Sequence, residues 1–178
     1  MMKSAFALLI VGLIAGGAGF IVSRMDQSKK SDHVFTALDG SRVDLSALKG
    51  KIVVLSFGAT WCPPCWEELP VLEELAEKYK NHPVAFYWVS IDDTEMSDEK
   101  LRQELKEKAP RFGFRVPVLR DPEAGLLVEH KVDGVPALLI FDREGKLVGQ
   151  PHLGFDGREA FLRDLSTTID SLLKRIQP

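Results

Sequence analysis

The segment KIVVLSFGATWCPPC, residues 51–65, joins a predicted strand to a predicted helix and contains both cysteines of the chain. Residues 51–57 form a β-branched, apolar run, which is typical of a central strand buried on both faces. A helix is expected to begin near Cys62 and to run to about Lys80. Pro70 should kink this helix, because proline removes one intrahelical hydrogen bond. The two cysteines therefore lie where a buried strand gives way to a helix.

Cys62 and Cys65 are the only cysteines, so any disulfide within the chain joins these two residues. A sulfur at the start of a helix lies near unpaired N–H groups and the positive end of the helix dipole, which favour a thiolate. We expect Cys62 to be the exposed attacking nucleophile. Cys65, one turn further on and more buried, is expected to resolve the mixed disulfide. Pro63 and Pro64 suit the first helical turn, where a missing N–H costs least.

The rest of the chain alternates between strand and helix patterns, which predicts a mixed α/β sheet covered by helices on both faces. An N-terminal β-hairpin extension is expected, with strands at 35–38 and 41–45 around an Asp39-Gly40 turn. Further strands are predicted at 84–91, 116–119, 137–141 and 146–149. Further helices are predicted at 97–108, 122–131 and 158–176, and the last of these has one apolar stripe.

Residues 4–22, SAFALLIVGLIAGGAGFIV, are a run of 19 residues without a charge. As a helix this run would be about 28 Å long, close to the hydrocarbon thickness of a bilayer. We expect residues 1–23 to be one transmembrane helix that anchors the chain, with a cleaved signal peptide as the alternative. Residues 24–33 are a predicted polar tether, and 34–178 form the domain. The flanking charges do not settle the orientation, because long domains translocate largely regardless of charge.

The composition fits one globular domain and excludes several classes of function. Of the 178 residues, 45% are apolar and 28% are charged. The net charge is −3, and because residues 1–30 contribute +3, residues 31–178 carry −6. Such an acidic body lacks the basic face that nucleic-acid binding needs. Two cysteines are too few for a four-thiolate zinc site, and Trp66 after Cys65 excludes covalent haem attachment.

These features resemble the thioredoxin superfamily, and more closely its membrane-anchored TlpA/ResA/CcmG-like thiol-disulfide oxidoreductases. The resemblance covers about residues 33–175 and depends most on ATWCPPC at 59–65 with Pro70 after it, supported by GVP at 134–136 and FDREGK at 141–146. It implies a thioredoxin-like fold and an enzyme that reduces protein disulfides with its dithiol and no bound cofactor or metal. It also implies an extracytoplasmic domain, anchored or secreted, that a membrane electron donor re-reduces.

The resemblance also implies roles for individual residues, matched by position. Pro136 is similar to the cis-proline that faces the dithiol, where the backbone before it, at Val135, pairs with the substrate chain. Glu68 is similar to the acidic residue that serves proton transfer, although it and its glutamate neighbours also fit a solvated helix face. Trp61 resembles an aromatic residue that shapes the docking surface. The expected substrate contacts are Trp61, Pro63, Pro64, Trp66, Val135 and Pro136.

Three positions depart from the family pattern. Gly58 stands where a second tryptophan is common, which should leave more space on one side of the site. Ser56 stands where cytoplasmic thioredoxins have a buried aspartate, so Glu68 becomes the candidate proton acceptor. Trp66 replaces the usual basic residue after the second cysteine, which should add an apolar surface at the rim of the site.

Two other functions are compatible with parts of this sequence. A copper-handling protein could use the thiolates as soft ligands with His130 or His152, although two residues between the cysteines is not the usual spacing for that class. A thiol peroxidase would place a threonine three positions before its cysteine, whereas Thr60 lies two positions before Cys62. The substrate stays open between apocytochrome c, an oxidase assembly factor and general disulfides. The redox potential and the oligomeric state are also not determined by these patterns.

Overall fold

The computed structural model describes residues 33–110, 112 and 115–175. The strands are β1 (Val34–Ala37), β2 (Arg42–Asp44), β3 (Ile52–Gly58), β4 (Val84–Ser90), β5 (Val118–Arg120), β6 (Ala137–Phe141) and β7 (His152–Leu153). The helices are the 3₁₀ helix η1 (Leu45–Leu48), α1 (Pro63–Lys78), α2 (Asp98–Lys108), α3 (Gly125–Glu129) and α4 (Arg158–Lys174). Within the described ranges, no helix is long and apolar enough to cross a bilayer. The predicted anchor at 1–23 lies outside these ranges.

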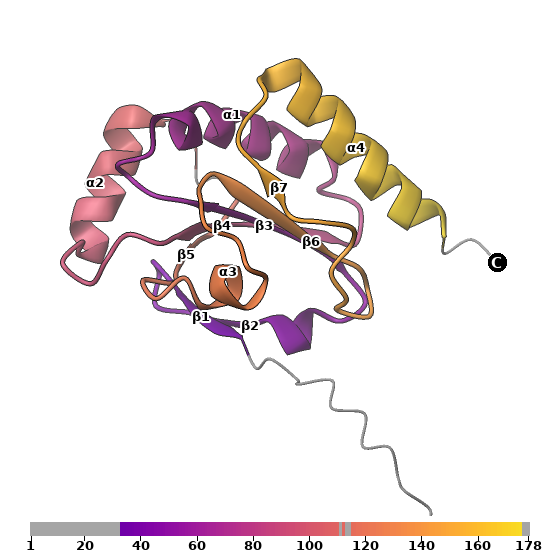
Figure 1. The fold of residues 1–178 in the computed structure, drawn as a ribbon, viewed down its shortest axis with the longest axis horizontal. Helices are drawn as coiled ribbons and strands as arrows, with labels where there is room; N and C mark the ends of the chain where they lie inside the picture. Colours follow the sequence, from indigo (N-terminus) through magenta and orange to yellow (C-terminus); the bar gives the residue numbers. More distant parts are fainter. Residues whose placement is uncertain (1–32, 111, 113–114, 176–178) are drawn as a thin grey trace, which may run out of the picture. The chain divides into compact units, whose positions relative to one another are not determined.

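The strands form one mixed sheet in the order β2-β1-β5-β4-β3-β6-β7 (Figure 1). β3 runs parallel to β4 and antiparallel to β6, and all seven of its residues are buried. β5 runs parallel to β4, whereas β1 runs antiparallel to both β2 and β5. The structure thus confirms the predicted central strand, the mixed sheet and the N-terminal hairpin.

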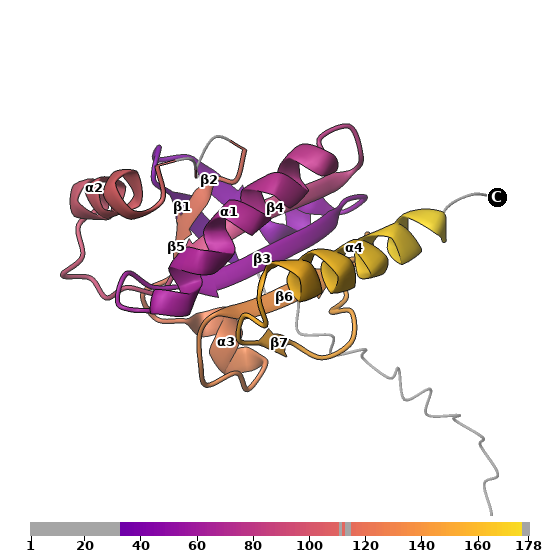
Figure 2. The ribbon, with the colours of Figure 1, turned by 90° about the horizontal axis from the view of Figure 1, so that it is seen from above.

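The side chains of β3 alternate between the two faces of the sheet, as the two-residue period of a strand requires. Ile52 and Val54 face the core made by α1, α2 and α4, whereas Val53, Leu55 and Phe57 face the core that includes α3. Figure 2 shows α1 and α4 lying along the same side of the sheet. The predicted covering of both faces by helices is therefore confirmed.

The return strand after β6 differs from the prediction. Residues 146–149 make a single antiparallel bridge, Phe141 to Leu147. The strand that follows β6 along the chain and pairs with its free edge is β7 at His152–Leu153. Gly149 has a φ of +69°, outside the extended region. Pro151 has no N–H to give to a ladder. Because of these two residues, the strand that pairs with this edge of β6 begins only at His152.

Several boundaries also differ from the predicted ones. α1 continues through Pro70 and ends at Lys78, and β5 lies two residues later than its predicted start. α3 begins only at Gly125, because Ala124 before it has a left-handed backbone with φ of 49°. α4 is described as far as Lys174, so the predicted end at Ile176 lies outside the described residues.

Candidate active site

Cys62 and Cys65 form a disulfide at the start of α1, with an S–S distance of 2.04 Å. This confirms the predicted pairing. Cys62 is the N-cap residue, with extended backbone angles of −103° and 100°, and Pro63 and Pro64 occupy the first two helical positions. The predicted placement of the dithiol between a buried strand and a helix is therefore observed.

The first turn of α1 has fewer free N–H groups than a helix usually offers. Pro63 and Pro64 have none, and the N–H of Cys65 donates to the carbonyl oxygen of Cys62 at 3.1 Å. The N–H of Cys62 itself donates to the Ala59 oxygen at 3.1 Å. Of the two features expected to favour a thiolate at Cys62, the helix dipole is present, whereas the first turn offers few N–H donors; the ionisation of Cys62 stays a prediction.

Both cysteines are buried in this oxidised form, with 3% of Cys62 and 1% of Cys65 exposed. The expectation that Cys62 is exposed is wrong for this state, because Ala59, Ile91 and Val135 pack around the disulfide. The chain neighbours of Cys62 are exposed, however, and Trp61 has 66% of its surface accessible. The surface that a partner can contact beside the disulfide is therefore formed by these exposed neighbours.

The Val135–Pro136 peptide bond is cis, as the resemblance predicted. Val135 packs against the cluster of Ala59, Cys62 and Cys65, which brings this loop to the dithiol. The carbonyl oxygen of Pro136 accepts a hydrogen bond from the N–H of Gly154 at 2.9 Å. Among the described residues, no hydrogen bond involves the backbone of Val135. Its N–H and C=O can therefore pair with an added peptide strand.

Glu68 is buried, with 2% of its surface exposed, and it lies three residues after Cys65 on the same face of α1. The hydroxyl of Ser56 on β3 donates to Oε1 of Glu68 at 2.6 Å. Burial raises the pKa of the Glu68 carboxyl from 4.5 to about 7, although the Ser56 hydrogen bond acts in the opposite direction. The solvated-face interpretation is thus wrong for Glu68, whereas Glu67 and Glu74 are exposed.

The space expected beside Gly58 is filled. A Cβ atom added at Gly58 would lie 2.7 Å from Nε1 of Trp88, a fully buried residue on the neighbouring strand β4. Tryptophan is therefore present next to this position, but it comes from a different strand. The expectation of an open side to the site is wrong for this reason.

Trp66 is half-buried, and its indole has partners within the chain. Its N–H donates to the carbonyl oxygen of Thr60 at 3.1 Å, and Nζ of Lys108 lies 5.0 Å from the ring centroid. Part of its apolar surface packs against the core on the α1 side of the sheet. Trp66 thus connects α1 to the segment before Cys62, and its predicted contact with substrate stays a prediction.

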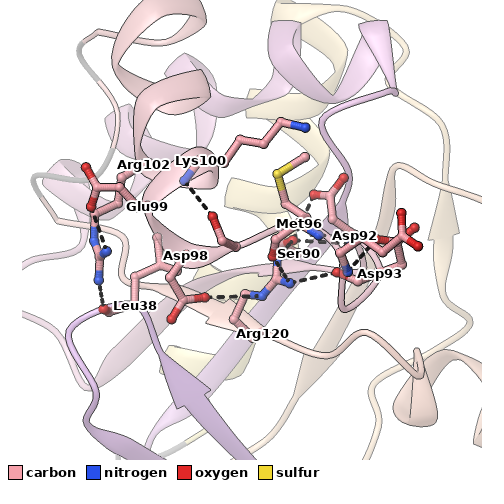
Figure 3. Close-up of polar contacts among 12 residues, drawn as sticks. Leu38, Ser90, Asp92, Asp93, Met96, Asp98, Glu99, Lys100, Arg102 and Arg120 are labelled. Atoms are coloured by element: carbon pink, nitrogen blue, oxygen red, sulfur yellow. Dashed lines mark hydrogen bonds and ion pairs between the residues drawn. The ribbon is translucent and has the colours of Figure 1, made fainter.

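Asp92 is a buried residue at this site that the sequence patterns did not single out. It lies two residues after the end of β4 and has 2% of its surface exposed. Its carboxylate accepts hydrogen bonds from Thr60 and from Ser90, and Figure 3 shows the contact with Ser90. Its position in the sequence, just after a predicted strand, could have identified it. β3 and β4 are parallel, so their carboxyl ends lie at the same edge of the sheet. An aspartate at that edge lies near the residues that precede Cys62.

The two histidines considered as metal ligands have aromatic neighbours instead. The His130 ring lies 5.9 Å from that of Phe141, and the His152 ring lies 6.4 Å from that of Phe161. Within the described part of the chain, no three His, Cys, Asp or Glu side chains gather as a metal site would require. The copper-handling alternative is therefore not favoured.

A mixed sheet, a Cys-x-x-Cys disulfide where the central strand meets a helix, and a cis-proline loop against that disulfide define the thioredoxin-fold thiol-disulfide oxidoreductases. The sequence model of the Redoxin family matches residues 26–168. The chain belongs to the Redoxin family, and within it to the TlpA/ResA/CcmG-like proteins that the sequence resembled.

Individual relatives support this assignment. A thiol-disulfide oxidoreductase ResA of Bacillus thuringiensis (strain Al Hakam) is 30% identical over 154 residues, covering 82% of this chain and 85% of its own. A solved structure from Chlorobium tepidum, described as a DsbE-type thiol:disulfide interchange protein, is 28% identical with a TM-score of 0.66, covering 80% of this chain and 93% of its own. The exposed lipoprotein thioredoxin Etrx1 of Streptococcus pneumoniae is 31% identical with a TM-score of 0.62, covering 77% and 99%.

Proposed function

We propose that this thiol-disulfide oxidoreductase works as a reductase of protein disulfides. The observation that carries the proposal is the Cys62–Cys65 disulfide packed against Val135, directly before the cis peptide bond to Pro136. The dithiol supplies both electrons, so the reaction needs no bound cofactor. A membrane-bound donor of reducing equivalents would restore the dithiol after each cycle.

The reaction proceeds through a mixed disulfide. The Cys62 thiolate attacks one sulfur of the substrate disulfide, the substrate S–S bond breaks, and the other substrate sulfur leaves as a thiolate that takes up a proton. Cys65, as a thiolate, then attacks the Cys62 sulfur and releases the second substrate thiol. Two electrons pass to the substrate, and the enzyme is left with the Cys62–Cys65 disulfide.

Glu68 is proposed to accept the proton of Cys65 before the second step. It is one helical turn from Cys65, it is buried, and its pKa is raised to about 7. A carboxyl with this pKa is present in both protonation states near neutral pH, which suits a group that takes up and returns a proton. Ser56 orients its carboxyl group through the 2.6 Å hydrogen bond.

The substrate is proposed to bind as an extended segment across the dithiol. The backbone of Val135, which has no hydrogen-bond partner among the described residues, would supply strand-like hydrogen bonds, and the exposed Trp61 would supply apolar contact area. Pro63 and Pro64 are exposed beside Cys62 and would border the same surface. Binding of this kind contacts the backbone of the substrate more than its side chains. It is therefore consistent with protein disulfides as the substrate class.

The domain is proposed to work outside the cytoplasm, held by a membrane anchor at residues 1–23 and a tether at 24–33. The support is the uncharged run at 4–22 and the exposed-lipoprotein character of the pneumococcal relative. Secretion after signal cleavage is the alternative. Fractionation of cells that produce the full chain separates these two cases, because an anchored protein stays with the membranes after alkaline washing.

The experiment that tests the function compares Cys62→Ser and Cys65→Ser with the unmodified chain in insulin reduction driven by dithiothreitol. Cys62→Ser should abolish activity, whereas Cys65→Ser should accumulate mixed disulfides with substrate. Full activity of Cys62→Ser would refute the mechanism. The direction is tested by equilibration with glutathione: a potential near about −120 mV, typical of a strong oxidant, would reject the reductase assignment.

A further inference from the structure

Asp92 forms a dense set of hydrogen bonds at the carboxyl end of β4. Its Oδ1 accepts from the N–H of Thr60 at 3.0 Å and from the Thr60 hydroxyl at 2.7 Å. Its Oδ2 lies 3.1 Å from the same N–H and accepts from the Ser90 hydroxyl at 2.9 Å. A carboxylate that is 2% exposed is costly to bury, and these donors compensate for the lost water.

Arg120 on β5 donates a hydrogen bond to the Ser90 hydroxyl oxygen, as Figure 3 shows. Its Nη1 donates to Ser90 Oγ at 3.0 Å, and its Nη2 donates to the carbonyl oxygens of Asp93 and Met96 at 3.0 and 2.8 Å. A serine hydroxyl has one hydrogen, and Arg120 occupies one acceptor position of its oxygen. The Ser90 hydrogen therefore points to Asp92, and the loop after β4 is held together with it.

Thr60 is held from the opposite side by Trp66. The indole N–H of Trp66 donates to the Thr60 carbonyl oxygen, while Asp92 binds the Thr60 N–H and hydroxyl. All three polar groups of Thr60 are thus engaged by residues from two different elements. Thr60 lies two residues before Cys62, and Trp66 directly follows Cys65, so these contacts enclose the disulfide at both ends.

This enclosure does not depend on the S–S bond. When the disulfide opens, the covalent link between Cys62 and Cys65 is lost, but the bonds from Asp92 and Trp66 to Thr60 involve neither sulfur. We infer that Asp92 is a positioning residue: together with Trp66 it clamps Thr60, and this keeps Cys62 within reach of Cys65 in the reduced enzyme. The inference rests on the dithiol exchange proposed above and assigns to it a residue that does not touch the reacting atoms.

The inference makes a prediction about the equilibrium between the Cys62–Cys65 disulfide and glutathione. That equilibrium constant reports the effective concentration of one thiol toward the other. Asp92→Ala removes the acceptors for Thr60, so the disulfide should become about tenfold easier to open, which corresponds to a potential less negative by about 30 mV. Trp66→Phe keeps a ring but removes the N–H donor, and it should shift the equilibrium in the same direction.

Asp92→Asn tests whether the hydrogen bonds of Asp92 or its negative charge affect the glutathione equilibrium. The asparagine oxygen can accept both Thr60 hydrogen bonds, so this variant should keep the clamp and stay within about threefold of the unmodified enzyme. It loses only the bond from Ser90, because Arg120 and the N–H of residue 92 already occupy both acceptor positions of the Ser90 oxygen. A role for Asp92 based on its negative charge predicts instead that Asp92→Asn and Asp92→Ala shift alike. Asp93→Ala is the matched control, since the exposed Asp93 carboxylate caps only the N–H groups of Glu95 and Met96.

Thermal unfolding of each variant is recorded in parallel to show that it is folded. If Asp92→Ala does not fold, Thr60→Val takes its place, because it removes the hydroxyl contact and leaves the Thr60 N–H bond intact. An unchanged glutathione equilibrium in folded Asp92→Ala and Trp66→Phe, or in folded Thr60→Val and Trp66→Phe, would overturn the clamp. An unmodified enzyme that fails to reduce insulin would instead overturn the proposed function, since the glutathione equilibrium can be measured without that activity.

Discussion

The hydroxyl of Ser56 donates a 2.6 Å hydrogen bond to Glu68 inside the core, and this links the central strand β3 to the helix that carries the dithiol. Ser56 and Glu68 are both buried, and Glu68 lies one turn beyond Cys65. The contact holds an ionisable group at a defined place behind the second sulfur. Its pKa of about 7 allows this carboxyl to change protonation in the range where disulfide exchange takes place.

Glu68 should make the stability of the fold depend on pH. Its pKa is about 7 in the folded chain against 4.5 as the ordinary value, so the folded state binds this proton more tightly than the unfolded state. The resulting stabilisation is complete below about pH 4.5 and is lost as the pH rises through 7, a change of about 3 kcal/mol. Glu68→Gln should lack this loss and should therefore gain stability relative to the unmodified chain at pH 8.

Urea unfolding of the oxidised chain at pH 4.5 and pH 8 measures this difference. Glu67→Gln is the control, because Glu67 is the adjacent glutamate on α1 but is exposed, and it should follow the unmodified chain at both pH values. Equal pH dependence in Glu68→Gln and the unmodified chain would show that Glu68 does not titrate as its burial requires.

Removal of the Ser56 hydroxyl should raise the pKa of Glu68 further. The hydrogen bond from Ser56 favours the ionised carboxylate, so in Ser56→Ala only burial acts on the pKa. The midpoint of the Glu68 carboxyl titration, followed by carbon-detected NMR, should move to higher pH. A midpoint that falls would mean that water replaces the hydroxyl and solvates the carboxylate better.

Trp61→Ala should impair substrate binding and leave the fold intact. Trp61 is 66% exposed next to Cys62, so its loss should change the unfolding free energy by less than about 0.5 kcal/mol. The kcat/KM for a protein disulfide should fall about tenfold, mainly through KM, if the ring is an anchor of the docking surface. Val34→Ala is the control: Val34 is also exposed, but β1 is separated from β3 by β5 and β4. Equal losses in both variants would argue against a specific surface.

Gly58→Ala should destabilise the fold. The new methyl group would lie 2.7 Å from Nε1 of the fully buried Trp88, and neither β3 nor β4 can move without disturbing its neighbours. Overpacking of this kind costs about 1–3 kcal/mol, measurable by urea unfolding. Gly134→Ala is the matched control, since nothing lies within 4 Å of its added Cβ atom. A stability of Gly58→Ala equal to that of the control would show that the indole can withdraw.

The predictions from sequence were most accurate where the signal is local. The apolar run of β3 and the Cys-x-x-Cys spacing depend on neighbours along the chain, and both were placed correctly. The strand predicted at 146–149 failed, because a few β-favouring residues do not show where Gly149 turns the backbone. The exposure of Cys62 was also misjudged, since Ile91 and Val135, which help to cover it, come from distant parts of the chain.

Glu67 and Glu68 have the same side chain in adjacent positions, and their different surroundings show what a pattern of residues leaves open. Periodicity and residue type were enough to recognise the sheet, the helix with its dithiol and the class of reaction, because each of these depends on a few neighbouring residues. The burial of Glu68, the approach of Trp88 to Gly58 and the bonds from Asp92 to Thr60 depend on strand register and helix packing. Those contacts join residues about 12 to 32 positions apart, and they exist only once the sheet has brought its strands side by side.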